Sequence, residues 1–392
     1  MPIIDTLRKL RRPRLQNLNS IGLYEHIFLE NLAHVQRHKP NDAIFPVVKS
    51  NAYGHGLKQV AQMLRATSVP YICVDSFPEY QIVKKYARKP SLVIWETLPS
   101  NYRYYDPKRA TIAVYNMSTL RTLIQLGRRQ RIHLFLNTGM NREGLQRQQL
   151  PDVISLLYNH PYLELEGVMS HLSDADHPSP VQLQKQQDQC AKMIQQIRAR
   201  GIHPKYIHIG NSAGRAKIND PYYNAWRVGI ALYGYSPLEP DDPDQKAHEV
   251  LAACKPRLQL RSHIISCQQI KQDDYVGYRN TFQAPHNGLI CTIPLWYNEG
   301  LMRHIQPHLH IKRKNTYIPC AGRVSMNLSS YYRTSTTEHD NAPRIYDEVI
   351  VYDHHPEAPN AIAKLAQQLD TIPYELLVKL DPTIHRRIIP AT

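Results

Sequence analysis

The sequence lacks the cysteine and apolar patterns that mark several classes of protein. Its six cysteines are scattered, and no two of them form a Cys-x-x-Cys pair. This argues against a disulfide framework and against a structural zinc site, so we predict no bound metal. No apolar run reaches the roughly 20 residues that a membrane-spanning helix requires. We therefore expect no membrane association and a cytoplasmic location.

The amino-terminal segment also lacks the features of a secretory signal. Residues 1–15 carry a basic cluster, but neither an apolar stretch nor a small-residue cleavage site follows it. Asp5 and the scarcity of serine make an organellar transit peptide a poor fit.

Negative charge is scarce relative to positive charge. The chain has 48 Lys and Arg against 33 Asp and Glu, a formal net charge of +15. Such an excess can signal nucleic-acid binding. Here the basic residues are spread over the chain, and no RNP, zinc-finger or basic-zipper signature accompanies them. We interpret the charge as a generally basic surface that attracts anionic ligands, and we predict no nucleic-acid partner.

Short apolar runs alternate with amphipathic stretches over the first 245 residues. Runs rich in β-branched residues, separated by helical patterns, indicate βαβ units and a parallel sheet. Eight such runs fit a (β/α)8 barrel, although their spacing alone fits a doubly wound sheet equally well. The expected strands are residues 43–48, 71–75, 92–95, 111–114, 132–136, 163–169, 206–209 and 228–233, and the expected helices are residues 57–66, 78–87, 118–126, 150–158 and 181–200.

The sequence pattern changes after Pro237, where strand-like runs become more frequent than helical stretches. Residues 239–244 form a Pro- and Asp-rich connector of the kind that separates domains. We therefore predict a barrel domain over residues 1–245 and a mainly β domain over residues 246–392. The expected strands of this second domain are residues 257–269, 289–294, 312–319 and 348–353, followed by a helix over residues 361–369.

The strongest local feature is an apolar strand that runs directly into Lys49 and then into a polar, glycine-rich turn. A lysine at the mouth of a barrel can be partly desolvated, which lowers its pKa and frees its lone pair for a carbonyl carbon. A lysine that forms a Schiff base requires this environment. The segment fits equally well an ordinary lysine at a strand end, with Gly54 and Gly56 making a turn.

The segment around Lys49 resembles the cofactor-lysine motif of alanine racemases, and further matches follow in the same order. The resemblance implies a pyridoxal-phosphate-dependent racemase of alanine, built as a (β/α)8 barrel followed by a β domain. It also implies a head-to-tail homodimer in which the second domain of one subunit completes the active site of the other. The matching segments are residues 46–56, 137–142, 170–171, 208–213, 227–234, 276–278, 293–297, 322–327 and 374–375.

Racemisation requires a proton to leave one face of the α-carbon and to return on the other, which two bases on opposite sides can achieve. The resemblance implies that Lys49 serves one face and Tyr278 of the partner subunit the other. Because the ordinary pKa of tyrosine is near 10, Tyr278 needs cationic donors nearby, and His171 hydrogen-bonded to Arg227 would provide them. Arg227 would also face the pyridine nitrogen and keep it unprotonated. Without its flanking Gly-Ile segment, Arg227 would instead suggest a buried arginine paired with a carboxylate.

The resemblance also assigns contacts to the rest of the cofactor and to the small-molecule amino-acid substrate. Arg142 and the backbone N–H of Met326 would hold the substrate carboxylate, and Tyr297 would narrow the entrance. The alternative for Met326 is simple core packing, and the alternative for Tyr53 and Tyr374 is burial at a surface turn. The phosphate ligands would be the hydroxyls of Tyr53, Ser212 and Tyr374 and the backbone N–H groups near Gly229 and Ile230.

Four positions depart from the family pattern. Many alanine racemases carry a carbamate-modified lysine that orients the substrate arginine, and this chain has Phe135 there, so Arg142 must be oriented in another way. An acidic residue is replaced by Asn327, and the usual Tyr-Ala-Asp-Gly turn reads Tyr-Asn-Glu-Gly, with Asn298 second. Arg279 follows the proposed tyrosine base where glycine is common.

These departures leave other functions open. The segments around Asn137, Arg279 and Met326 look closer to broad-specificity amino-acid racemases, which suggests that larger or basic amino acids are also accepted. A degenerate paralogue that binds pyridoxal phosphate without catalysis is a further alternative. A decarboxylase of the same fold type is disfavoured, because the second domain carries the racemase segments of Tyr278 and Met326.

Overall fold

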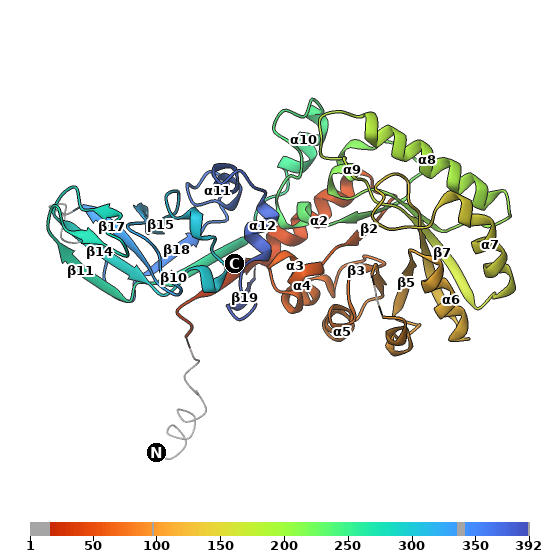
Figure 1. The fold of residues 1–392 in the computed structure, drawn as a ribbon, viewed down its shortest axis with the longest axis horizontal. Coiled ribbons are helices and arrows are strands. Elements are labelled where there is room, and N and C mark those ends of the chain that lie inside the picture. Colours follow the sequence, from red (N-terminus) through yellow and green to blue (C-terminus); the bar gives the residue numbers. More distant parts are fainter. Residues whose placement is uncertain (1–15, 96–97, 335–341, 391–392) are drawn as a thin grey trace, which may run out of the picture.

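The computed structural model describes residues 16–95, 98–334 and 342–390 of the chain. The basic cluster noted in residues 1–15 lies outside these described residues. Two units lie side by side along the long axis of the molecule, with α12 and β19 close to their junction (Figure 1). One unit is built mainly of alternating strands and helices, and the other is built mainly of strands.

The first unit is a parallel barrel. Strands β3 to β8 form one parallel sheet in chain order, and β2 pairs in parallel with β9. The ring closes where Val47 bridges Cys73 on one side and where the Asn224 N–H donates to the Ile207 carbonyl (3.1 Å) on the other. This confirms the predicted (β/α)8 barrel. Its strands are β2 (Ala43–Pro46), β3 (Ile72–Val74), β4 (Ser91–Val93), β5 (Ala110–Val114), β6 (Gln130–Phe135), β7 (Leu163–Met169), β8 (Tyr206–His208) and β9 (Ala225–Val228).

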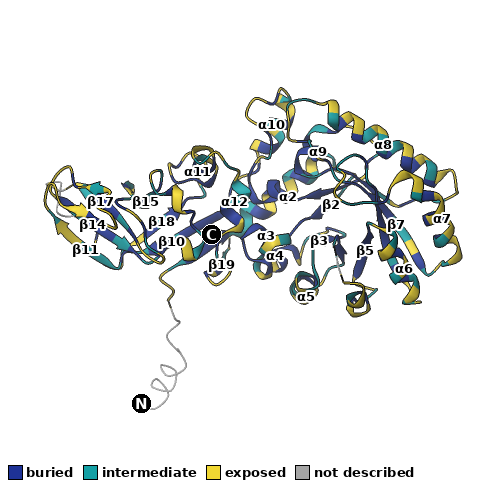
Figure 2. Ribbon diagram, viewed as in Figure 1, coloured by how far each residue is buried: buried dark blue, intermediate teal, exposed yellow. Residues whose placement is uncertain are grey.

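Helices cover the outside of the barrel. In α8 the buried side chains, among them Leu183, Met193 and Ile194, lie on the side that faces the barrel, and Figure 2 shows its outer side exposed. No helix of the described ranges combines the length and the apolar character needed to cross a membrane. The helices of this unit are α2 (Glu25–His38), α3 (Lys49–Tyr53), α4 (Leu57–Leu64), α5 (Phe77–Tyr86), η1 (Pro99–Tyr104), α6 (Met117–Gln125), η2 (Arg147–Gln149), α7 (Leu150–Asn159), α8 (Val181–Arg198), α9 (Ser212–Lys217), η3 (Ile230–Tyr233) and α10 (Gln245–Ala252).

The last predicted barrel strand, residues 228–233, is wrong in its placement. The strand is β9, which ends at Val228, and most of the predicted segment forms the short 3-10 helix η3. Residues of η3 are buried on all sides, so their sequence is uniformly apolar whichever conformation they adopt. A short apolar run therefore does not distinguish a buried strand from a buried helical turn.

The second unit contains two main sheets. Six strands run in the order β16-β15-β18-β10-β1-β19, and three in the order β11-β14-β17. The predicted continuous run over residues 257–269 is divided into β10 and β11. The elements are β10 (Leu258–His263), β11 (Ser266–Ile270), β12 (Tyr275–Val276), β13 (Phe282–Gln283), β14 (Gly288–Ile293), η4 (Tyr297–Glu299), η5 (Arg303–Ile305), β15 (His310–Arg313), β16 (Thr316–Pro319), β17 (Ser329–Thr334), β18 (Glu348–Tyr352), α11 (Ile362–Gln368), α12 (Pro373–Val378) and β19 (His385–Ile389).

The first strand of the chain belongs to this second unit. β1 (Ser20–Tyr24) pairs antiparallel with β10 and parallel with β19, although the prediction placed residues 1–245 in the barrel. Both partners of β1 lie more than 200 residues away in the sequence, so a local pattern carries no sign of this pairing. Helix α12 in turn packs against α3 of the barrel, which brings a segment from the end of the chain to the barrel mouth.

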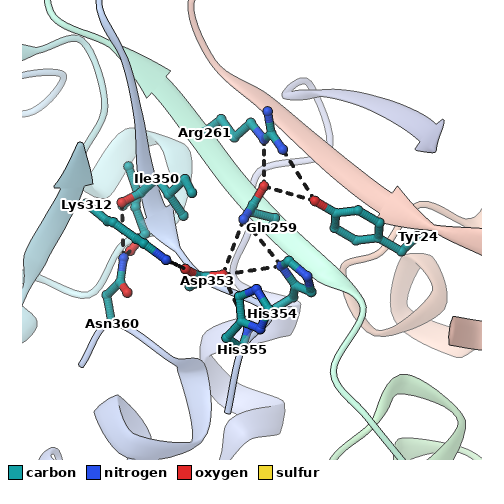
Figure 3. A network of polar contacts seen from close by, with 10 residues as sticks. Tyr24, Gln259, Arg261, Lys312, Ile350, Asp353, His354, His355 and Asn360 are labelled. Carbon is teal, nitrogen blue, oxygen red and sulfur yellow. Dashed lines mark hydrogen bonds and ion pairs between the residues drawn. The ribbon is translucent and has the colours of Figure 1, made fainter. Parts of the chain in front are cut away.

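A network of polar contacts connects three neighbouring strands of the six-stranded sheet (Figure 3). The buried carboxylate of Asp353 pairs with Lys312 Nζ (2.9 Å) and accepts a hydrogen bond from Gln259 Nε2 (3.2 Å). The ring of His354 stacks on Tyr24, with 4.3 Å between centroids. Ligand atoms of Asp353, His354 and His355 lie within 4.8 Å of one another, but the lysine and the amide already satisfy the carboxylate. We interpret this network as structural.

Candidate active site

A cavity of about 230 Å³ opens at the carboxyl ends of the barrel strands. This is the end at which barrel enzymes carry their active sites. Most of the site residues predicted from the sequence meet here. Those that line the cavity are Lys49, Tyr53, Arg142, His171, Ser212, Arg227, Gly229, Ile230 and Tyr374.

Lys49 occupies the cavity because the chain makes an unusual turn after β2. Ser50, Asn51 and Ala52 all have φ near +53°, in the left-handed region. This conformation costs about 1–2 kcal/mol for each non-glycine residue, and such strain persists where other contacts hold it. Glu79 provides such a contact, since its Oε1 accepts a hydrogen bond from the Ser50 N–H (2.8 Å).

Two side chains that the sequence analysis did not single out surround the amine of Lys49. Asp75 Oδ2 lies 3.6 Å from Lys49 Nζ, and the ring centroid of Trp95 lies 4.9 Å from it. Burial raises the pKa of Asp75, and the charge of Lys49 opposes that shift. Asp75 directly follows β3 and Trp95 lies two residues beyond β4, so a polar or aromatic residue just after a barrel strand was the available signal.

Arg227 is buried among nitrogen and carbonyl acceptors. Its Nη2 donates to His171 Nδ1 (3.1 Å), and its Nη1 donates to His208 Nδ1 (2.8 Å). Within the described residues no carboxylate forms an ion pair with Arg227, so the alternative of a carboxylate-paired arginine fails. Burial lowers the pKa of Arg227 to about 10, which still leaves the guanidinium charged at neutral pH.

His171 is neutral in this setting. Burial, and then the charge of Arg227, lower the pKa of His171 to about 3. Because its Nδ1 accepts from Arg227, the proton of the neutral ring resides on Nε2. The His171–Arg227 pair therefore presents an N–H donor as well as a nearby permanent positive charge.

The predicted phosphate ligands lie together around Gly229. Ser212 Oγ accepts hydrogen bonds from the backbone N–H groups of Gly229 (3.2 Å) and Ala231 (3.3 Å), which leaves its own hydroxyl hydrogen to donate. A Cβ at Gly229 would overlap the Tyr53 hydroxyl. The rings of Tyr53 and Tyr374 lie 5.9 Å apart, and burial raises the pKa of both, so they remain neutral donors. This set of hydroxyl donors fits a phosphate group.

Arg142 lines the same cavity, as does the apolar side chain of Phe135. The guanidinium pairs with the adjacent Glu143 through Nε (2.5 Å) and Nη2 (2.6 Å). Glu143 was not predicted as a site residue.

Three predicted residues do not line this cavity. Tyr278, Tyr297 and Met326 belong to the second unit, and they are 66%, 42% and 57% exposed, respectively. Tyr278 forms an isolated bridge with Arg323, and Arg279 next to it has a positive φ of 62°. Within one chain these residues therefore lie outside the cavity that Lys49 lines.

Comparison with known proteins identifies the family. The family description "Alanine racemase, N-terminal domain" matches residues 25–237, and "Alanine racemase, C-terminal domain" matches residues 257–388. The chain belongs to the alanine racemase family. Among named relatives, the alanine racemase of Staphylococcus saprophyticus is 28% identical over 359 residues, which cover 90% of this chain and 89% of the relative. That of Sorangium cellulosum is 29% identical over 323 residues, 78% and 80% of the two chains.

Solved structures of alanine racemases share the fold. The Clostridium difficile 630 protein superposes with a TM-score of 0.86 at 24% identity, covering 96% of this chain and 97% of the other. The Bacillus anthracis protein with bound L-Ala-P gives a TM-score of 0.83 at 23% identity, with 96% of each chain covered. A barrel followed by a β domain is thus the architecture of the family members that this chain resembles.

Proposed function

We propose that this chain is a pyridoxal-phosphate-dependent alanine racemase that interconverts L- and D-alanine by a two-base mechanism. The observation that carries the proposal is the convergence of Lys49, the His171–Arg227 pair and the hydroxyl cluster around Gly229 on one cavity. A cytoplasmic location and a supply of D-alanine for peptidoglycan are parts of the same proposal.

The residues of the cavity would hold the cofactor at its two ends. Lys49 would bind it covalently, and the hydroxyls of Tyr53, Ser212 and Tyr374 would hold its phosphate, together with the backbone near Gly229 and Ile230. The fixed charge of Arg227 would lie at the ring nitrogen, and this guanidinium does not give up its proton at neutral pH. When bound, pyridoxal phosphate acts as an electron sink for the α-carbon of the substrate.

Proton transfer at the substrate α-carbon would use two bases. The amine of Lys49 would take or return the proton on one face, beside Asp75. Tyr278 of the partner subunit would act on the opposite face. The Nε2–H of His171 would donate to its phenolate oxygen, and the charge of Arg227 behind the imidazole would further favour the ionised phenol.

The exposure of Tyr278, Tyr297 and Met326 supports a head-to-tail homodimer. A tyrosine base that is two-thirds exposed has no place in the mechanism unless another surface covers it. In such a dimer, the backbone N–H of Met326 from the partner subunit would join Arg142 at the substrate carboxylate. Tyr297 from the partner subunit would narrow the entrance.

Exchange of the α-proton in D₂O tests this function. The wild type should exchange and racemise both L- and D-alanine, and Tyr278→Phe should lose exchange mainly with the L enantiomer. Assays on serine, lysine and arginine would measure how broad the specificity is. Binding of pyridoxal phosphate with neither exchange nor racemisation of any of these amino acids would instead indicate a non-catalytic paralogue.

A further inference from the structure

The guanidinium of Arg142 is held along one edge by a carboxylate next to it in the sequence. Glu143 contacts both Nε (2.5 Å) and Nη2 (2.6 Å) of Arg142, which is the bidentate geometry of a strong arginine–carboxylate pair. The side chain of Glu143 is only 11% exposed, whereas that of Arg142 is 47% exposed. The pair therefore has a shielded anionic half and a cationic half that is open to the cavity.

The face of the same guanidinium is held by an aromatic ring. The centroid of Trp95 lies 5.1 Å from Arg142 Cζ and 4.9 Å from Lys49 Nζ, so one indole contacts both cations. Arg142 is thus fixed along one edge by Glu143 and on one face by Trp95. Its remaining N–H groups make no hydrogen bond within the described part of the chain, and they are the ones available to a ligand.

Glu143 itself lies in a turn that is closed back onto the barrel. The Leu145 N–H donates to the Phe135 carbonyl (2.7 Å), and the Asn137 N–H donates to the Leu145 carbonyl (3.0 Å). Gly144 has φ +109°, and a Cβ there would press on the Asn137 backbone. The position of Glu143 is therefore set by backbone contacts rather than by its pairing with Arg142 alone.

The neighbouring wall of the cavity offers Arg142 no competing anion. Phe135 is 3% exposed and apolar, and the carboxylate of Asp75 is already paired with Lys49 at 3.6 Å. Among the described residues, Glu143 is the carboxylate that pairs with Arg142.

We propose that Glu143 is the positioning residue that orients Arg142, so that the open end of the guanidinium binds the carboxylate of the amino-acid substrate. This role rests on the function proposed above. Glu143 contacts neither the reacting carbon nor the cofactor in this scheme, and it acts only through Arg142. Without it the guanidinium would keep its charge but would sample several orientations over Trp95, and substrate binding would weaken more than turnover.

The test uses the holoenzyme and the isosteric variant Glu143→Gln, with Glu164→Gln as the matched control. Glu164 belongs to β7, and its side chain forms an exposed ion pair with Arg129. In Glu143→Gln we expect the KM for alanine to rise about tenfold with kcat changed less than about twofold. The dissociation constant of propionate, a carboxylate that lacks the amine, should rise in parallel when measured by calorimetry. Glu143→Asp, which keeps the charge but reaches less far, should lie between the wild type and Glu143→Gln.

The propionate measurement separates this inference from the proposed function, because it does not depend on turnover. Weaker propionate binding in Glu143→Gln alone would support the positioning role even if no amino acid were racemised. Unchanged propionate binding and an unchanged KM in an active racemase would overturn the positioning role and leave the function intact. A loss of kcat at constant KM would also overturn it. Thermal melting and cofactor absorbance of each variant identify any misfolded protein. If Glu143→Gln is misfolded, Glu143→Asp is compared with the wild type instead.

Discussion

His133 Nδ1 lies 2.8 Å from His208 Nε2 in the interior of the barrel, where both rings are buried. His208 Nδ1 accepts from Arg227, so its Nε2 carries the proton and donates to His133. The Nε2 of His133 then points towards Glu166, 3.8 Å away. This chain of contacts requires both histidines to be neutral, because each accepts a hydrogen bond on Nδ1.

The buried histidines predict a loss of stability in mild acid. Burial lowers the pKa of His55, His133, His171 and His208 below the ordinary value of 6.5. Below pH 6.5 the unfolded chain binds protons that the folded protein excludes. The free energy of unfolding therefore decreases as the pH is lowered. Each histidine contributes a slope of about 1.4 kcal/mol per pH unit, from 6.5 down to its folded pKa. Above pH 6.5 these groups contribute no pH dependence.

Urea unfolding between about pH 7.5 and about pH 5.5 measures this slope. We expect the free energy of unfolding to decrease over this interval, by up to about 1.4 kcal/mol for each buried histidine that stays neutral in the folded protein. A flat profile would show that the buried rings are protonated in the folded state.

The contact between Gly229 and Tyr53 predicts the effect of a single methyl group on cofactor binding. In Gly229→Ala the new Cβ would overlap the Tyr53 hydroxyl and displace a proposed phosphate ligand. We expect the affinity for pyridoxal phosphate to fall at least about tenfold, as measured by titration of the apoprotein. As a control, Gly127→Ala meets no neighbouring atom but has φ +60°, so it should cost about 1 kcal/mol of stability with no change in cofactor affinity. Equal affinities of the two variants would contradict the proposed phosphate site.

The residues that share a motif could be predicted from the sequence, and those that meet only in space could not. Lys49 and Arg227 each lie beside a distinctive glycine-containing segment, and both line the cavity. Asp75 and Trp95 follow barrel strands without any motif of their own, and their approach to Lys49 depends on the barrel closing. Glu143 is adjacent to Arg142 in the sequence, but its direction is set by the positive φ at Gly144 and by backbone contacts to Phe135.

The fold shows the same division. Alternation of apolar runs and helical patterns predicted βαβ units and a parallel sheet, because strands between helices are largely buried and helices are apolar on one side. The choice of a barrel over a doubly wound sheet came from the resemblance to the family. The position of β1 depends on β10 and β19, which both lie more than 200 residues further along the chain, so no local pattern indicated it. The expectation that Arg142 is oriented without a carbamate at Phe135 now has a structural candidate in Glu143.

The shared aromatic contact of Lys49 and Arg142 predicts a graded effect of substitutions at Trp95. A cation over an indole face gains about 0.5–2 kcal/mol, depending on how far it is desolvated. Trp95→Leu should therefore raise the KM for alanine about threefold to tenfold, whereas Trp95→Phe keeps a π face and should have a smaller effect. Steady-state kinetics on both variants check the order. A larger defect in Trp95→Phe than in Trp95→Leu would show that packing volume, and not the ring face, matters at this position.

Lys49 lines the cavity and Tyr278 of the same chain does not, which predicts that two inactive variants restore activity to each other. In the proposed homodimer, Lys49→Ala and Tyr278→Phe should each damage both sites. In a head-to-tail heterodimer of the two, one site receives an intact Lys49 from one subunit and an intact Tyr278 from the other. Random reassortment after mild dissociation should thus recover about a quarter of wild-type activity, since half the dimers are mixed and each has one functional site. Variants mixed without dissociation provide the baseline, and a failure to exceed it when native electrophoresis shows heterodimers would place both bases in the same chain.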